Sequence, residues 1–124
     1  MTSDPWPTEI RLKDKGRTLA VCFDGGEAFD LSAEYLRVMS PSAEVQGHSA
    51  AERKTVGGKR NVAIIQVEPV GNYAVRLVFD DMHSTGIYSW HYLHELGSEH
   101  ETKWADYLAA LEARALTRDR PGTA

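Results

Sequence analysis

The sequence of 124 residues contains a single cysteine, Cys22. One cysteine excludes a disulfide framework within the chain and a zinc site built from several thiolates. Long apolar runs are also missing, since none approaches the roughly 20 residues that a membrane-spanning helix needs. The opening stretch MTSDPWPTEI lacks the basic and apolar regions of a secretory signal. We therefore expect a cytoplasmic protein with no membrane segment, in which Cys22 is a small strand residue and not a nucleophile.

An excess of one charge is missing as well. The formal net charge is only -4, and no block of like charge stands at either end. This argues against nucleic-acid and anionic-membrane binding, which require a concentrated basic face. The content of 42% hydrophobic and 26% charged residues is that of an ordinary globular domain. We expect a flexible arm over 1–8, a single domain over 9–117 and a frayed tail over 118–124.

Short alternating runs are present throughout and predict antiparallel β structure. The run EIRLKDKGRTLAVCF alternates apolar and polar residues on both sides of DKG, as two strands joined by a turn do. The strongest strand signal is VAIIQVEPVGNYAVRLVF, in which PVGN separates two runs of mostly branched aliphatic residues. With EAFDL and TGIYS, the sequence predicts about six short strands arranged in hairpins.

Three helices complete the prediction. Ser32 is expected to cap a short helix that stops by Met39, because Pro41 disfavours helical geometry at the residue before it. Ser89 is expected to cap a second helix, which Gly97 ends. The fold class is therefore α+β, with one short inserted helix and C-terminal helices packed on the sheet. The last helix is expected to bury one apolar face made of Trp104, Tyr107, Leu108 and Leu111.

The irregular stretch from Ser40 to Asn61 is rich in serine, glycine and charge. A loop of this length in a compact domain is often functional or mobile. Its glycines do not form a phosphate-binding loop, because VGGK lacks the required spacing and no Ser or Thr follows the Lys. The loop carries a basic cluster that is either a solvated surface or a candidate interaction surface for a phosphate or an acidic partner: Arg53, Lys54, Lys59 and Arg60.

The most chemically suggestive stretch is VFDDMHSTGIYSW. Asp80, Asp81 and His83 are residue types that bind metals or transfer protons, and His48 could approach them in space. Asp is equally favoured in turns, because its carboxylate accepts backbone N–H bonds. Two functional hypotheses follow from this stretch. One is weak iron or zinc binding through His83 with the nearby Asp and His residues, and the other is a small enzyme with Asp81 and His83 as an acid–base pair.

Three longer stretches carry a family resemblance: LRVMSPSAEVQGH (Leu36–His48), VEPVGNYAVRLVFDDMHSTGIYSWHYLHELG (Val67–Gly97) and WADYLAAL. Together they resemble the gamma-butyrobetaine hydroxylase-like N-terminal domain family, over most of the chain from about Ile10 to Leu111. Such domains occur alone in bacteria and ahead of the catalytic domain of carnitine-pathway 2-oxoglutarate dioxygenases. A related domain follows the ATPase module in Mrp-like iron–sulfur cluster carriers.

The resemblance also bears on metal binding. In the dioxygenases the domain holds a structural zinc through three cysteines and a histidine, which correspond here to Ser40, Ser42, about Val45, and His83. Two hydroxyls and a valine cannot replace three thiolates, so the resemblance does not imply this zinc site here. Relatives that stand alone usually read Asp-Asp-Gly-His at the turn. Met82 departs from that pattern and puts the geometry of the turn in question.

These observations favour a non-catalytic binding or accessory module with no cofactor and with a protein partner of unknown identity. The resemblance alone suggests a link to iron–sulfur cluster assembly or to 2-oxoglutarate dioxygenase systems. Metal binding and acid–base catalysis at the turn remain the two alternatives.

Overall fold

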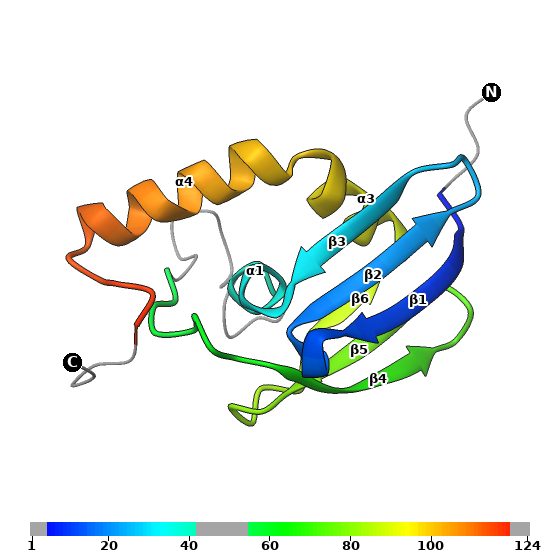
Figure 1. Cartoon of the computed structure of the whole chain (residues 1–124), viewed down its shortest axis with the longest axis horizontal. Helices are drawn as coiled ribbons and strands as arrows, with labels where there is room; N and C mark the ends of the chain where they lie inside the picture. Colours follow the sequence, from blue (N-terminus) through cyan, green and yellow to red (C-terminus); the bar gives the residue numbers. More distant parts are fainter. Residues whose placement is uncertain (1–4, 42–54, 120–124) are drawn as a thin grey trace.

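The computed structural model describes residues 5–41 and 55–119 (Figure 1). The fold class predicted from the sequence, α+β with six short strands followed by helices, is confirmed. The strands form two three-stranded antiparallel sheets and not one. The first sheet has the order β1 (Pro7–Lys13), β2 (Thr18–Phe23), β3 (Ala28–Ser32), and the second has the order β4 (Ile64–Val70), β5 (Ala74–Phe79), β6 (Ile87–Ser89).

Two of the helices begin directly after the serines that were predicted to cap them. The hydroxyl of Ser32 accepts a hydrogen bond from the Tyr35 amide at 3.0 Å, and that of Ser89 accepts one from the Tyr92 amide at 3.1 Å. None of the helices in the described part of the chain is long and apolar enough to cross a membrane. The helices are α1 (Ala33–Val38), α3 (Trp90–Ser98) and α4 (His100–Ala113), with a short 3-10 turn, η1 (Asp14–Gly16).

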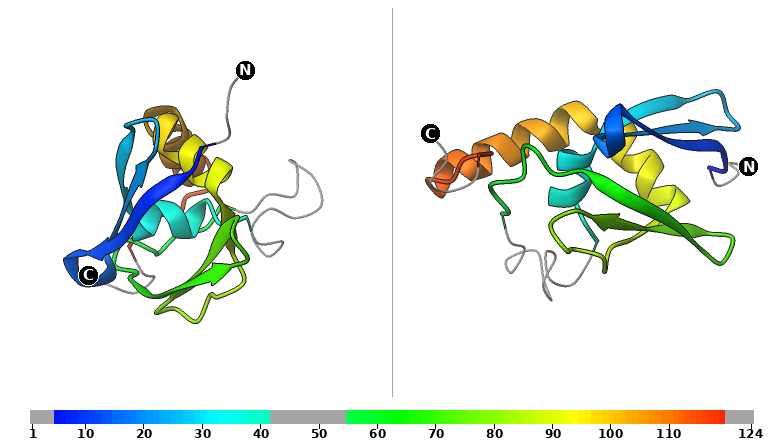
Figure 2. Two further views of the ribbon diagram at one scale, coloured as in Figure 1. Left: turned by 90° about the vertical axis from the view of Figure 1, so that its right-hand side faces the viewer. Right: turned by 60° about the horizontal axis from the view of Figure 1, so that its bottom comes forward.

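One core serves both sheets and the helices. Along β5 the side chains of Val75, Leu77 and Phe79 alternate with more exposed ones and are 3%, 0% and 1% exposed, as period-two alternation predicts. They belong to the same cluster as Leu19 and Val21 of β2. In both views of Figure 2, α1 lies between α4 and the β4–β5–β6 sheet.

The two sheets meet closely at Gly16. This residue ends η1 with φ at +87°, and a Cβ built on it would overlap the carbonyl oxygen of Ile64 in β4. Both the backbone conformation and the contact therefore require glycine.

Gly97 has a different role from the predicted one. It does not end α3, which continues to Ser98. A Cβ on Gly97 would overlap the ring of Phe29 in β3, so glycine lets the helix pack directly onto that strand. The prediction was wrong because a glycine near the end of a helix has the same appearance in sequence whether it terminates the helix or permits close packing.

The predicted apolar face of α4 is partly wrong. Tyr107 and Leu111 are buried and Trp104 is half-buried, but Leu108 is 40% exposed. The helix contacts α1: the rings of Trp104 and Tyr35 meet edge-on, with their centroids 6.0 Å apart. With six residues against the 14 of α4, α1 offers a limited surface for packing, and Leu108 stays exposed.

The ends of the domain also differ from the prediction. β1 begins at Pro7, inside the predicted arm, because its pairing with β2 extends to Phe23. Arg118 and Asp119 fall in the predicted tail but are bound to the domain, through ion pairs to Glu34 and Arg60. Both residues are held by ion pairs to side chains that are far away along the chain. A local sequence pattern does not reveal such partners.

Candidate functional site

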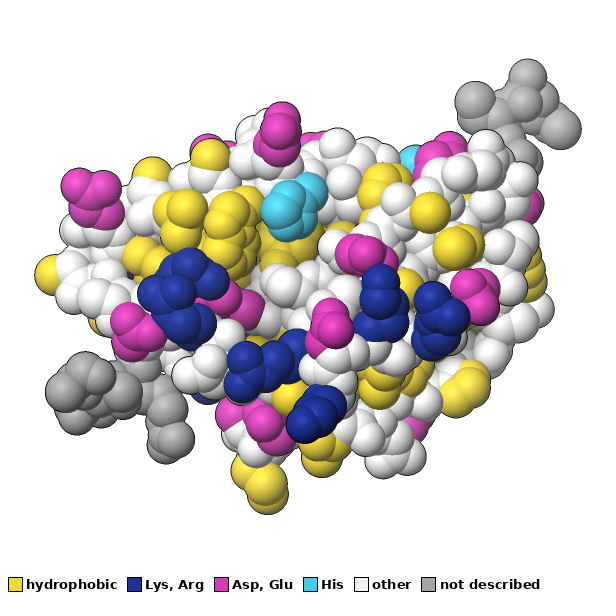
Figure 3. Space-filling view, in the orientation of Figure 1, with side chains coloured by type: hydrophobic (Ala, Val, Ile, Leu, Met, Phe, Trp, Pro, Cys, Tyr) yellow, Lys and Arg dark blue, Asp and Glu magenta, His cyan; other side chains and the backbone are white. Residues whose placement is uncertain are grey.

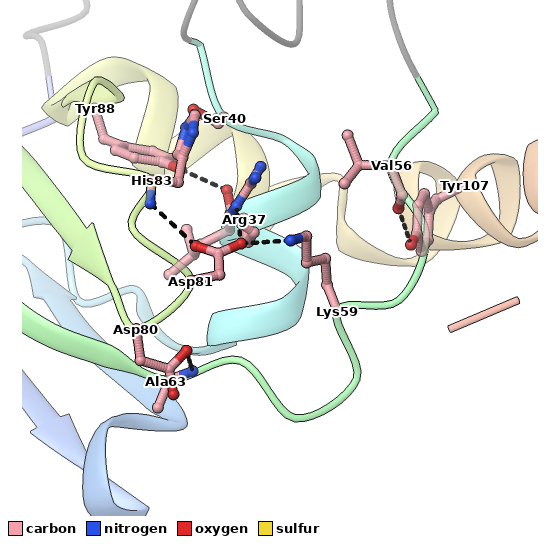
Figure 4. Close-up of polar contacts among 11 residues, drawn as sticks. Arg37, Ser40, Val56, Lys59, Ala63, Asp80, Asp81, His83, Tyr88 and Tyr107 are labelled. Carbon is pink, nitrogen blue, oxygen red and sulfur yellow. Dashed lines mark hydrogen bonds and ion pairs between the residues drawn. The ribbon is translucent and has the colours of Figure 1, made fainter. Parts of the chain in front are cut away.

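The turn between β5 and β6 carries the suggestive acidic residues, and its two aspartates point apart (Figure 4). Asp80 faces the start of β4. Its backbone N–H donates to the Ala63 carbonyl at 2.9 Å, and its carboxylate accepts from the Ala63 N–H at 3.1 Å. Asp80 thus closes the turn onto the neighbouring strand, which is the structural role that Asp often has in turns.

Asp81 faces the opposite way and binds two cations. Arg37 Nε lies 2.8 Å from Asp81 Oδ2, and Lys59 Nζ lies 2.5 Å from the same oxygen. The other oxygen accepts the backbone N–H of His83 at 3.2 Å. Asp81 therefore ties together the last turn of α1, the segment before β4 and its own turn.

These contacts keep the Asp81 carboxylate ionised. Burial alone would raise its pKa, but the hydrogen bonds from Lys59 and the His83 amide, and the charge of Arg37, outweigh burial and hold the pKa below its usual range. A general acid near neutral pH needs the opposite shift. The two cations also compete with any metal ion for the same oxygen.

His83 lies on another side of the turn and is only 6% exposed. Its Nε2 atom is 2.9 Å from the hydroxyl oxygen of Ser40, which is itself fully buried and follows α1 by two residues. Beside them the hydroxyl of Tyr88 donates to the Leu36 carbonyl at 2.5 Å, and burial raises the pKa of Tyr88 so that it remains a donor. Ser40 and His83 are two of the positions that the family resemblance assigns to zinc ligands, and here they contact each other.

The structure does not gather the predicted site residues around one ligand. Within the described ranges no group of three or more His, Cys, Asp and Glu side chains could hold a metal ion. Of the predicted basic cluster, Lys59 pairs with Asp81, and Arg60 pairs with Asp119 at 2.6 Å. The remaining candidates lie outside the described residues: Ser42, Val45, His48, Arg53 and Lys54.

A cavity of about 290 Å³ adjoins the turn. Both aspartates line it, but His83 does not, so Asp81 and His83 do not act together across this cavity. The residues that line the cavity are Gly58, Lys59, Asn61, Val62, Asp80 and Asp81.

Arg37, the residue that fixes Asp81, was missed by sequence reasoning. It is an ordinary cation in the last turn of a helix, and its partner is 44 residues away.

Met82 occupies the tip of the turn with φ at +76°, so the backbone keeps a conformation that favours glycine. Its side chain is 90% exposed and contributes little packing. We expect Met82→Gly to raise the free energy of unfolding by about 0.5–1 kcal/mol, since relief of the left-handed strain exceeds the entropy that glycine adds to the unfolded chain. Urea unfolding measures this. A stability equal to that of Met82→Ala would show that the backbone here is unstrained.

Comparison with known proteins identifies the family of this chain and solved structures that are similar to it. Residues 10–94 match the family described as gamma-butyrobetaine hydroxylase-like, N-terminal. Two solution NMR structures resemble the whole chain: one is 42% identical over 98% of this chain and 95% of its own (TM-score 0.83), the other 46% identical over 100% and 98% (TM-score 0.79). A crystal structure of a DUF971-family protein of unknown function from Acidithiobacillus ferrooxidans is 40% identical over 78% of this chain and 100% of its own, with a TM-score of 0.65. No curated protein matched.

Proposed function

Because this chain belongs to the family of gamma-butyrobetaine hydroxylase-like N-terminal domains, we propose that it is a non-catalytic accessory module that binds a protein partner. One observation carries the proposal. The polar residues of the turn that suggested chemistry are engaged in the fold itself: Asp80 with Ala63, Asp81 with Arg37 and Lys59, and His83 with Ser40. An acid–base pair or a metal site needs these groups to converge on a ligand, and they face three different neighbours instead.

The outer face of the β4–β5–β6 sheet is the surface that fits a protein partner. Ile87 lies opposite Arg76 in the strand pairing, on the face away from the core, and is 45% exposed. Arg76 forms an ion pair with Glu68 on the next strand. Ile65, at the irregular start of β4, is 64% exposed. Ile65 and Ile87 are thus exposed aliphatic side chains on the same sheet as this ion pair, and a protein partner can bury apolar side chains beside charged groups.

Strand addition at the sheet edges is a less suitable mode of binding. Of the four edge strands, β1 and β4 each contain a proline, Pro7 and Pro69, and each has a shift in its pairing register. The other two edges are β6, which is only three residues long, and β3, on which α3 packs. Prolines and bulges are common devices that protect exposed edges from further strands. This directs the proposal to the face of the sheet and away from its edges.

The charge distribution also favours a protein partner over a nucleic acid. On the face shown in Figure 3, Lys and Arg side chains are interspersed with Asp and Glu side chains. Several cations on the described surface are paired, among them Lys13 with Asp30 and Arg60 with Asp119. Nucleic-acid binding depends on cations that are free to meet phosphates. By association with the family, we look for the partner among iron–sulfur cluster assembly proteins and 2-oxoglutarate dioxygenases.

The test is a pull-down in which the tagged full chain is the bait and a lysate of the organism that produces it supplies the partners. The tag contains no histidines. We expect the wild type to retain a specific protein, and Ile65→Glu/Ile87→Glu to lose it. Leu108→Glu places one glutamate at an exposed leucine of α4, outside the proposed surface, and is expected to retain the partner, which makes it the control. Equal retention by the correctly folded double variant would contradict the proposed surface. Failure of the wild type to retain any protein above background would contradict the proposed function.

Metal content measured on the same purified chain addresses the metal-binding alternative. We expect zinc and iron far below one atom per chain, with no change in His83→Ala. One atom of either metal per chain, lost in a folded His83→Ala variant, would establish the alternative in place of the proposal.

A further inference from the structure

The chain does not fray after α4 but turns back along the domain. Ala115 adopts φ of +55° directly after the helix. The amide of Ala115 donates to the Glu112 carbonyl at 3.1 Å, and that of Leu116 donates to the Leu111 carbonyl at 2.9 Å. This pair of bonds is the Schellman arrangement that ends many helices and reverses the chain. The residues that follow, 116–119, are called the strap below.

The strap runs beside the segment that precedes β4. The amide of Gly58 donates to the Thr117 carbonyl at 2.9 Å, and that of Arg60 donates to the Arg118 carbonyl at 3.0 Å. Arg60 Nε also lies 2.6 Å from the Asp119 carboxylate. The approach is close, because a Cβ built on Gly57 would lie 2.8 Å from the Thr117 oxygen. Two backbone bonds and an ion pair therefore fasten residues 57–60 to the strap.

The strap is in turn fixed to α1. The Arg118 guanidinium donates two hydrogen bonds to Glu34, at 2.8 and 2.7 Å, and Glu34 is only 5% exposed. The same guanidinium lies 5.2 Å from the centre of the Trp104 ring. Bidentate pairs of this kind are among the stronger polar contacts. Arg118 thus anchors the strap between the two helices.

The segment held by the strap forms one wall of the cavity beside the turn. Gly58, Lys59, Asn61 and Val62 line the cavity from this side, and Asp80 and Asp81 line it from the other. Lys59 is also the residue that reaches across to Asp81. We propose that the strap is a latch that holds this wall in place, so that release of Arg118 from Glu34 opens the cavity and frees Lys59. The strap lies beyond the residues that match the family, 10–94, and the latch is independent of the proposed partner surface.

Amide hydrogen exchange and lysine acetylation on the full chain test the latch. In Arg118→Ala we expect exchange at Gly58 and Arg60 to rise about tenfold or more, because both amides lose the strap carbonyls. Acetylation of Lys59 relative to the exposed Lys15 is expected to rise several-fold with it. The amide of Leu77 in β5 should exchange at the wild-type rate. Arg11→Ala, which removes an exposed arginine from β1, is the control and should change none of these rates.

A second variant keeps the test valid if Arg118→Ala folds poorly. Arg60→Ala removes only the ion pair with Asp119, in which the side chains of Arg60 and Asp119 are 44% and 52% exposed. It should raise the same exchange and acetylation rates by a smaller factor than Arg118→Ala does. Faster exchange at Gly58 and Arg60 with unchanged acetylation of Lys59 would overturn the coupling between strap and cavity. An equal rise at Leu77 would overturn the latch in favour of general destabilisation.

Discussion

Replacing Gly16 by alanine is expected to lower the free energy of unfolding by about 3 kcal/mol or more, since it combines two penalties. The added Cβ would overlap the carbonyl oxygen of Ile64, and a backbone atom in a strand cannot move aside as a side chain can. The residue would also have to keep φ near +87°, which disfavours any residue with a Cβ. The first sheet would have to move away from β4, and the shared core would open.

Gly26→Ala is the matched control for this prediction. Gly26 has φ of +96°, but nothing lies within 4 Å of the position that its Cβ would take. The control therefore carries the backbone strain without the overlap, and we expect it to cost about 1–2 kcal/mol. Urea unfolding of both variants separates the two penalties. Equal losses would mean that the sheets do not meet at Gly16 as described.

Asp81→Asn is expected to cost about 2–3 kcal/mol at neutral pH. The side chains of Arg37 and Lys59 are only 11% and 22% exposed, so loss of the shared carboxylate charge leaves two poorly solvated cations together. Breaking a buried pair in this way usually costs about 3–5 kcal/mol, which we reduce for the partial exposure.

The matched control for Asp81→Asn is Asp30→Asn. The pair of Lys13 and Asp30 is similar in chemistry, but its side chains are 37% and 62% exposed. Surface pairs of this kind contribute about 0–1 kcal/mol, so this variant should unfold close to the wild type. If Asp81→Asn were as stable as Asp30→Asn, the contacts of Asp81 with Arg37 and Lys59 would not stabilise the fold.

Local signals predicted most of the secondary structure. Period-two alternation and branched aliphatic runs predicted about six strands, and Ser32 and Ser89 marked the residues directly before α1 and α3. These features depend on neighbours within a few residues along the chain. The separation into two sheets was not predictable in the same way, because it depends on which hairpins pair and on the contact between Gly16 and Ile64, 48 positions apart.

The candidate site was predicted less well than the fold. Sequence reasoning selected Asp81 and Lys59, but not their meeting point or Arg37, since residue types do not reveal partners across 44 positions. Partners that are distant along the chain also decide the burial of α4. Its 3.6-residue period predicted which residues share an apolar face, but not that Leu108 on this face would stay exposed. The family motif did help, because it related Ser40 to His83, and these side chains are in contact.

The free energy of unfolding between about pH 7 and pH 2.5, measured for the wild type and for Asp81→Asn, tests most directly whether the turn is a structural element. The folded-state pKa of Asp81 is depressed, so its contribution is present above the unfolded-state pKa of about 4 and is lost as the pH falls through the lower folded-state pKa. We predict a gap of about 2–3 kcal/mol at neutral pH that closes as the pH falls below about 4. Curves that coincide at neutral pH, or a variant that is more stable than the wild type, would contradict a structural role for Asp81 and indicate a role in binding or catalysis.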